Sequence, residues 1–177
     1  MANADRPNGF IYVANLTGGG EYIEHMTHAL ADTVAIGRGD LVTPTGAART
    51  VEQYDNNDPV WGLSLSYVAL STLGYPDVIH LNHTSVLEAQ EDSGGGAADF
   101  IAAADQGLNA QIVVAAANTT TGLSNMEVDS NTAATTTTLA LRLLRPVPRP
   151  GNTVAAINCR WFVTPLELDI AEAKAGI

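Results

Sequence analysis

Short apolar or β-branched runs, separated by turn residues, occupy most of this chain. The clearest pattern spans residues 60–68, where every second position carries a large side chain: Trp61, Leu63, Leu65 and Tyr67. A period of two residues is typical of a strand with one buried face. We therefore predict a strand over residues 60–68.

Further strands are predicted where similar runs are bounded by Gly, Pro, Asn or Asp. These runs cover residues 10–14, 33–36, 41–43, 48–54, 77–81, 85–90, 110–115, 135–144 and 155–163. The run at 135–144 is interpreted as one long strand that ends at Pro146, because its first half is β-branched and its second half alternates. Many short strands joined by turns indicate a mainly β fold, a small β-barrel or sandwich with long loops.

Helical patterns occur at two places only. The alanine-rich residues 97–104 predict one short helix, and the acidic tail at 165–177 has a proline suited to the first turn of another. Residues 1–9 are polar and contain Pro7 and Gly9, so they predict an extended N-terminal arm that is mobile unless a partner holds it. The expected organisation is this arm, a β-rich domain at 10–164 with one lobe or two, and the tail at 165–177.

The charge balance restricts the partners. The chain has 8 Lys and Arg residues against 19 Asp and Glu residues, a net charge of −11. Such a charge opposes contact with phosphate backbones, so we expect no nucleic-acid partner. No run of about twenty apolar residues predicts a membrane span, and the N-terminus lacks a signal-peptide pattern. We therefore expect synthesis in a cytoplasm and no membrane contact.

Metal-binding motifs are incomplete. His25 and His28, like His80 and His83, form His-x-x-His pairs, but residues three apart on a strand face opposite sides and no third ligand has motif spacing. Loop or surface histidines are the preferred interpretation. Residues 55–58 bring together four oxygen-bearing side chains, yet a turn before Pro59 explains them better than a calcium loop does. No metal or cofactor is predicted.

Arg38, Gly39 and Asp40 form a tripeptide that adhesion receptors read. A tight turn that uses Gly37 and Gly39 for unusual backbone dihedrals is the preferred interpretation. The glycine clusters at 18–20 and 94–96 lack the lysine of a phosphate-binding loop, so they predict flexible connections.

Motifs of an enzyme are not recognisable in the sequence. It contains no Gly-x-Ser-x-Gly elbow and no serine, histidine and carboxylate in a known catalytic order. Cys159 is the single cysteine and alternates with apolar neighbours, which indicates a buried, inert thiol rather than a nucleophile. A non-enzymatic protein is expected.

Several segments together point to one protein family. They are residues 1–10, 36–42, 87–92, 106–110, 119–135, 139–144, 149–152 and 161–163. In this order, and over most of the chain, they resemble structural cement proteins of tailed-bacteriophage heads. Residues 119–150 are the most specific part, whereas residues 14–33 and those after 164 depart from the pattern.

The resemblance implies a non-enzymatic cement or decoration protein on the outer surface of the virion capsid. Such a protein binds in many copies and stabilises contacts between major capsid protein subunits. The resemblance also implies self-association, as a homodimer in preference to a trimer. The residues expected to contact the capsid or a second copy are Asp5, Arg6, Pro7 and Phe10. Two alternatives stay open, a virion-surface receptor-binding or adhesive module and a small hydrolase with an unrecognised site.

Overall fold

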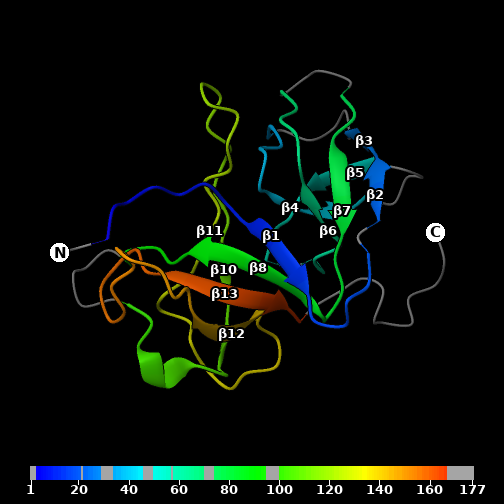
Figure 1. Cartoon of the computed structure of the whole chain (residues 1–177). Coiled ribbons are helices and arrows are strands. Elements are labelled where there is room, and N and C mark those ends of the chain that lie inside the picture. The colour runs from blue at the N-terminus through cyan, green and yellow to red at the C-terminus, as the bar shows by residue number, and fades with distance from the viewer. Residues whose placement is uncertain are drawn as a thin grey trace.

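The fold of this protein, seen in a computed structural model, is mainly β, as predicted. The structure describes residues 3–20, 22–28, 34–45, 50–56, 58–69, 74–94 and 100–166. Within these residues the strands form three sheets, and every strand pairing is antiparallel except that of β3 with β5 (Figure 1).

The longer strands of the chain form a five-stranded sheet. Its order is β1 (Ile11–Asn15), β8 (Ser85–Gln90), β13 (Arg160–Pro165), β12 (Leu141–Pro146) and β9 (Asn109–Ala110). The pairing places Val163 beside both Leu87 and Leu143. Because side chains alternate between the two faces of a strand, these three residues share the inner face and bury it in the main core.

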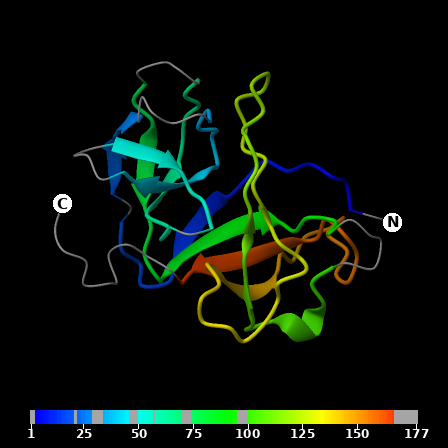
Figure 2. The ribbon, with the colours of Figure 1, turned by 180° about the vertical axis from the view of Figure 1, so that it is seen from behind.

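A six-stranded sheet packs beside the first one and curls into a half-barrel (Figures 1 and 2). Its order is β2 (Ile23–His25), β7 (Asp77–His80), β6 (Gly62–Ser64), β4 (Leu41–Pro44), β5 (Thr50–Gln53) and β3 (Thr27–His28). The smallest sheet pairs β10 (Ile112–Val113) with β11 (Glu127–Val128).

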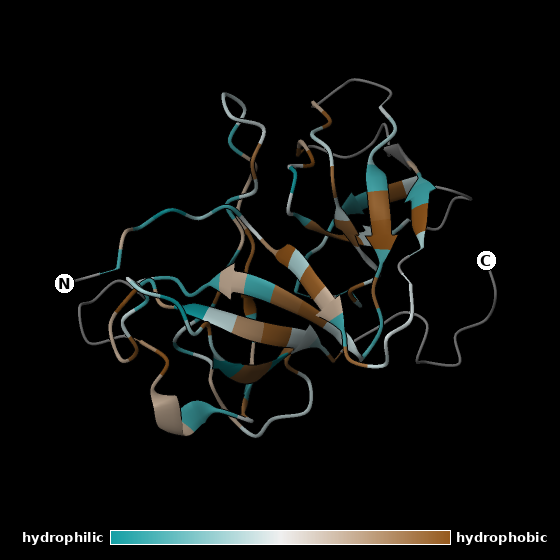
Figure 3. Ribbon diagram, in the orientation of Figure 1, coloured by the Kyte–Doolittle hydropathy of each residue, from teal (hydrophilic) through white to brown (hydrophobic). Residues whose placement is uncertain are grey.

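The main hydrophobic core is continuous between the two larger sheets. Leu41, Leu63 and Ile79 of the six-stranded sheet belong to the same buried cluster as Leu87 and Trp161 of the five-stranded sheet. Figure 3 shows hydrophobic and hydrophilic residues alternating along the larger strands. A second buried cluster fills the curled sheet and consists of Met26, Ile36, Val42, Val51 and Val78.

The predicted helix at residues 97–104 is wrong in its described part. Residues 100–102 are not helical, and only a single 3-10 turn, η1 (Ala103–Asp105), follows them; residues 97–99 lie outside the described residues. The Glu91 carboxylate accepts the N–H of Ile101 at 2.8 Å, and Ile101 is fully buried. These tertiary contacts fix the segment and override the helical propensity of alanine.

Two predicted strands begin later than expected. Residues 135–140 are turns and bends, and β12 begins at Leu141, because the threonines at 135–138 are exposed and have no packed surface to cover. In the run 155–163, Ala155 and Asn158 have φ of 60° and 62°. Left-handed dihedrals are incompatible with a strand, so β13 starts only at Arg160.

The C-terminal tail is described only at its start. Pro165 is the last residue of β13, and the N–H of Leu166 donates a hydrogen bond to the carbonyl oxygen of Ala140 at 2.7 Å. The helix expected in the tail falls on residues 167–177, which lie outside the described residues.

Candidate functional site

The N-terminal segment, residues 3–9, lies along its own domain before the chain enters β1 (Figure 1). Its anchor is Asn3, of which 9% is exposed. The Asn3 side-chain amide donates to the carbonyl oxygens of Thr153, Ala156 and Ile157 at 2.9, 3.3 and 3.1 Å. Its Oδ1 accepts the N–H of Thr153 at 2.7 Å. One polar side chain therefore ties the segment to the loop at residues 147–158.

Gln90 and Arg160 hold the middle of the segment. The Gln90 side chain donates to Asp5 Oδ1 at 3.3 Å and accepts the N–H of Arg6 at 3.2 Å. The Arg160 guanidinium donates to the carbonyl oxygen of Arg6 at 3.0 Å. The expectation that residues 3–9 have no partner in their own domain is therefore wrong, because backbone and side-chain polar groups, rather than apolar surface, attach them.

Of the four predicted contact residues, three lie on the surface and one lies in the core. Asp5 and Arg6 are exposed and Pro7 is half-buried, so all three are on the surface. Phe10 belongs to the main core with 2% of its surface exposed, and its N–H bonds the carbonyl oxygen of Gly39 at 2.9 Å. The Phe10 side chain is therefore packed in the core of its own domain.

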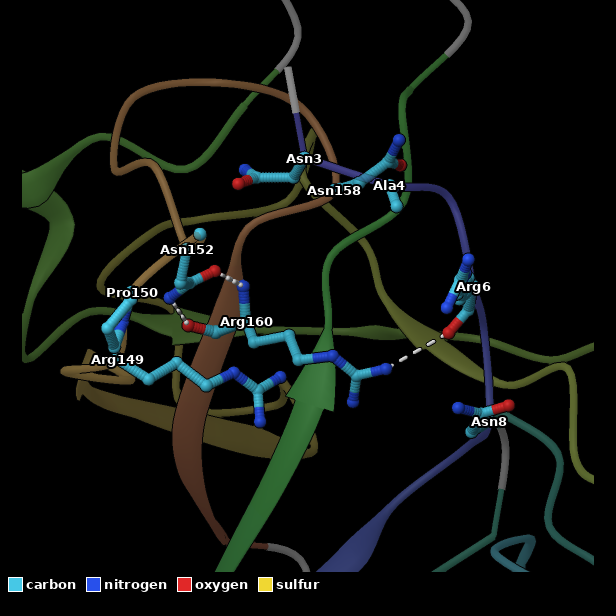
Figure 4. Close-up of a pocket in the computed structure, with 10 residues that line it drawn as sticks. Asn3, Ala4, Arg6, Asn8, Arg149, Pro150, Asn152, Asn158 and Arg160 are labelled. Atoms are coloured by element: carbon cyan, nitrogen blue, oxygen red, sulfur yellow. Dashed lines mark hydrogen bonds between the residues drawn. The ribbon is translucent and has the colours of Figure 1, made fainter. Parts of the chain in front are cut away.

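A pocket of about 310 Å³ lies between the N-terminal segment and the loop at 147–158 (Figure 4). Three of the chain's eight basic residues line it: Arg6, Arg149 and Arg160. Asn152 holds the loop beside it, because its amide donates to the carbonyl oxygens of Val147 and Arg160 and its Oδ1 accepts the N–H of Arg160. We call this cavity the arginine pocket.

One carboxylate is ion-paired with two of these arginines. Glu88 Oε1 lies 2.9 Å from a guanidinium nitrogen of Arg149 and 3.3 Å from one of Arg160. The Arg6 guanidinium makes no ion pair or hydrogen bond with any described residue, since Arg6 is bonded only through its backbone. Two of the pocket's guanidinium groups thus already pair with an internal carboxylate, and the third, that of Arg6, is unpaired among the described residues.

The same face of the five-stranded sheet carries further arginines. Phe162 pairs with both Glu88 and Arg145 across the strands, and the Arg145 guanidinium lies over its ring, 5.4 Å from the centroid. Arg142 occupies the same face at the far end of β12, because inward-facing Leu141 and Leu143 flank it. We call this surface, made of Arg6, Arg142, Arg145, Arg149 and Arg160, the arginine face. It holds five of the eight basic residues.

Carboxyl groups lie behind the N-terminal segment. Burial, together with the neighbouring charges of Asp5 and Asp92, raises the pKa of Glu127 to about 7. Burial likewise raises the pKa of Glu91 to about 7, against the lowering effect of hydrogen bonds from the N–H groups of Ile101 and Cys159. When Glu91 and Glu127, which we call the acidic layer, are ionised, they repel an anion that approaches the adjacent arginine pocket.

The Arg38-Gly39-Asp40 tripeptide forms a turn in which Gly39 and Asp40 are buried and Arg38 is exposed. Gly39 has a φ of +95°, and the N–H of Asp40 bonds the carbonyl oxygen of Gly37 at 3.1 Å. Gly37 has no such dihedral; a side chain there would collide with Ala117. Asp40 is fully buried, and burial raises its pKa to about 6. The predicted turn is confirmed, and an external receptor cannot reach the Asp40 carboxylate.

His25 and His80 pair with carboxylates of their own sheet. His25 Nδ1 lies 2.6 Å from Asp77 Oδ1, and His80 Nε2 lies 3.1 Å from Glu24 Oε2. His80 also packs against Trp61, with ring centroids 4.0 Å apart. Across the described ranges, no three His, Cys, Asp or Glu residues gather in a way that could hold a metal ion.

The other candidate positions have structural roles. The N–H of Asp58 bonds the carbonyl oxygen of Asp55 at 3.2 Å, which makes the predicted turn. Cys159 is buried, as predicted, and burial raises its pKa to about 12. The described part of the chain has no helix of membrane-spanning length and hydrophobicity.

An apolar groove of about 440 Å³ lies between the two larger sheets. It runs beside β1, which is an edge strand of the five-stranded sheet, and Phe10, Leu63 and Ile79 contribute to its wall. Ile11 and Val13 of the same edge strand are almost half exposed. The groove is a second surface on which an extended segment could lie.

Comparison of the sequence with protein-family models and with curated proteins, and of the fold with solved structures, found no match.

Proposed function

We propose that this chain is a non-enzymatic capsid cement protein, which binds the outer surface of a tailed-phage head in many copies and stabilises contacts between major capsid protein subunits. The observation that carries the proposal is the arginine face. A chain of net charge −11 gathers five of its eight basic residues there, so the rest of its surface is acidic. A surface with one attractive side favours one orientation of binding, which a regular lattice requires.

The resemblance to cement proteins supplies the identity of that lattice. It includes residues 1–10 and 149–152, which contribute to the two sides of the arginine pocket. A protein that binds the assembled shell better than its separated subunits stabilises the shell by mass action. If two linked copies each contact a coat subunit, modest interfaces become hard to release. No reaction chemistry is required.

Binding to isolated heads tests the proposal. Purified protein is added to expanded, DNA-free heads that lack it, and the bound amount is measured by co-sedimentation. We expect saturable binding in many copies per head and a higher temperature of shell disruption for the decorated heads. Equal disruption temperatures with and without bound protein would contradict a cement role. A gel-shift assay is the control, with no DNA binding expected at physiological salt because the net charge repels phosphates.

A second function, a receptor-binding or adhesive module, is favoured by one feature. The hairpin at residues 114–125 has an exposed tip, while Gly122 and Ser124 form backbone hydrogen bonds with Arg38 on the body of the molecule. Figures 1 and 2 show the hairpin beside the six-stranded sheet. At its tip Asn118 accepts the N–H of Gly122 through its backbone carbonyl at 2.7 Å, and the side chains at 119–121 are exposed. Copy number separates the two functions, because a receptor-binding module at the tail is present in only a few copies per virion.

A further inference from the structure

The arginine pocket holds more positive charge than its internal partners neutralise. Arg6, Arg149 and Arg160 bring three guanidinium groups to one cavity, and Glu88 is ion-paired with the last two. The Arg6 guanidinium has no partner among the described residues, and 46% of the Arg149 side chain is exposed. Both can therefore donate hydrogen bonds to an incoming group.

We propose that the arginine pocket binds the carboxylate of an acidic side chain on the protein partner, with Arg6 and Arg149 as the donors. The identification of that partner as a coat subunit rests on the proposed function. Guanidinium groups pair with carboxylates through charge-assisted hydrogen bonds, as Arg149 and Arg160 do with Glu88, which does not itself line the pocket.

The local charges favour a single carboxylate over a polyanion. Besides Glu88, the Asp5 carboxylate lies beside the pocket on Gln90, so two carboxylates offset three guanidinium groups and about one positive charge remains. Glu127 adds further negative charge nearby when it ionises. A phosphate backbone would bring several negative charges toward this acidic layer, whereas one carboxylate matches the surplus.

The ligand must arrive from a surface outside the domain. Arg6 is exposed, and Arg160, with 12% of its side chain exposed, lies deeper in the same pocket. Arg145 continues the positive surface across the sheet from Glu88. An acidic side chain that projects from a protein surface can enter the pocket while its neighbours meet the rest of the arginine face.

Asn3 is a positioning residue for this site. Its four hydrogen bonds to the loop at 153–157 fix the start of the segment that carries Arg6. Arg149 lies in the loop at residues 147–158, and Arg160 follows that loop as the first residue of β13. Closure of the N-terminal segment on the loop therefore assembles the pocket from residues about 150 positions apart in the chain.

The first test measures binding to heads. Arg6→Gln and Arg149→Gln are made singly and in combination, and each single variant is matched by Arg38→Gln, an exposed arginine outside both the pocket and the arginine face that changes the net charge equally. We expect about tenfold weaker binding for the combination, the pocket variant, weaker binding for each single variant than for the control, and a change within about twofold for the control. Equal weakening in the single variants and the control, or none in any variant, overturns the pocket proposal. Circular dichroism verifies that all the variants are folded.

The second test uses a defined probe and does not depend on heads. A capped hexapeptide with one glutamate among serines is titrated into the full-length protein while the arginine side-chain N–H signals are followed by NMR. We expect shifts at Arg6 and Arg149 that disappear in the pocket variant. Stronger shifts with inorganic phosphate or a single-stranded oligonucleotide overturn the carboxylate assignment.

The two tests distinguish a failure of the cement function from a failure of the pocket proposal. If wild-type protein does not bind heads, the cement function is overturned, and the peptide titration still decides what the pocket binds. If wild-type protein and the pocket variant bind heads equally well, the cement function stands and the pocket proposal is overturned.

Discussion

Gly9 and Gly39 are in backbone contact where the N-terminal segment crosses the buried turn. A Cβ atom on Gly9 would lie 2.5 Å from the carbonyl oxygen of Gly39 and would collide with the Ser124 side chain. Gly9 also has a φ of +66°, a conformation that other residues rarely adopt. The crossing thus fixes the point at which the N-terminal segment joins β1.

Replacing Gly9 with alanine should therefore destabilise the protein. The substitution adds left-handed strain and a collision with atoms that are themselves buried, so we expect a loss of about 2 kcal/mol or more in the free energy of unfolding. Urea unfolding measures it. Gly18→Ala is the matched control, because Gly18 has a φ of +71° and nothing within 4 Å of its Cβ position. An equal loss in both variants would show that strain alone, without the collision, explains the effect.

Removing the Asn3 side chain should loosen the N-terminal segment. Asn3→Ala leaves the N–H of Thr153 without its acceptor and breaks three further hydrogen bonds to the loop. We expect a loss of about 1–3 kcal/mol in stability and faster amide hydrogen exchange at residues 4–8. Asn125→Ala, which removes one solvent-exposed hydrogen bond to the carbonyl oxygen of Ala116, is the control. Unchanged exchange in Asn3→Ala would contradict the anchoring role.

Strands whose apolar patterns end at turn residues could be predicted from the sequence. The predicted strand at 85–90 coincides with β8, the one at 10–14 is displaced by one residue from β1, and the one at 77–81 is one residue longer than β7. Local pattern fails where tertiary contacts decide. The sequence of residues 100–104 does not predict that the Glu91 carboxylate accepts the N–H of Ile101, because the two residues are ten positions apart.

Only part of the candidate site could be predicted from the sequence. Asp5 and Arg6 were predicted as contact residues, but their bonds to Gln90 and Arg160 span 84 and more positions, which no periodicity reveals. One signal was available, since four of the eight basic residues fall between positions 142 and 160 of an acidic chain. Their convergence on one sheet face depends on the pairing of β12, β13 and β8.

Cys159 should resist thiol reagents in the native protein. The side chain is buried, and a pKa of about 12 leaves almost no thiolate at neutral pH. We expect no modification by Ellman's reagent in buffer and complete modification in denaturant. Thr120→Cys, at the exposed tip of the hairpin, is the positive control and should react at once. Rapid modification of native wild-type protein would contradict the burial of this thiol.

The protein should be more stable at mildly acidic than at mildly alkaline pH. The folded-state pKa values of Glu91 and Glu127 are raised from 4.5 to about 7, so between these values the folded state binds protons that the unfolded state has released. The stabilisation is complete below the unfolded pKa and is lost as the pH rises through about 7. For the fully buried Glu91 it amounts to at most about 3 kcal/mol, and partial exposure of Glu127 reduces its share.

Urea midpoints between about pH 8 and pH 5 test this dependence. The midpoint should rise as the pH falls, and Glu127→Gln should flatten the slope because it removes the carboxylate that Asp5 and Asp92 repel. The same variant should hold the N-terminal segment more firmly at alkaline pH, since Asp5 loses a like-charged neighbour. Asp55→Asn, at an exposed turn, is the control and should keep the wild-type slope. A midpoint that falls or stays level toward pH 5 would show that the buried carboxyl groups ionise as readily in the folded state as in the unfolded one.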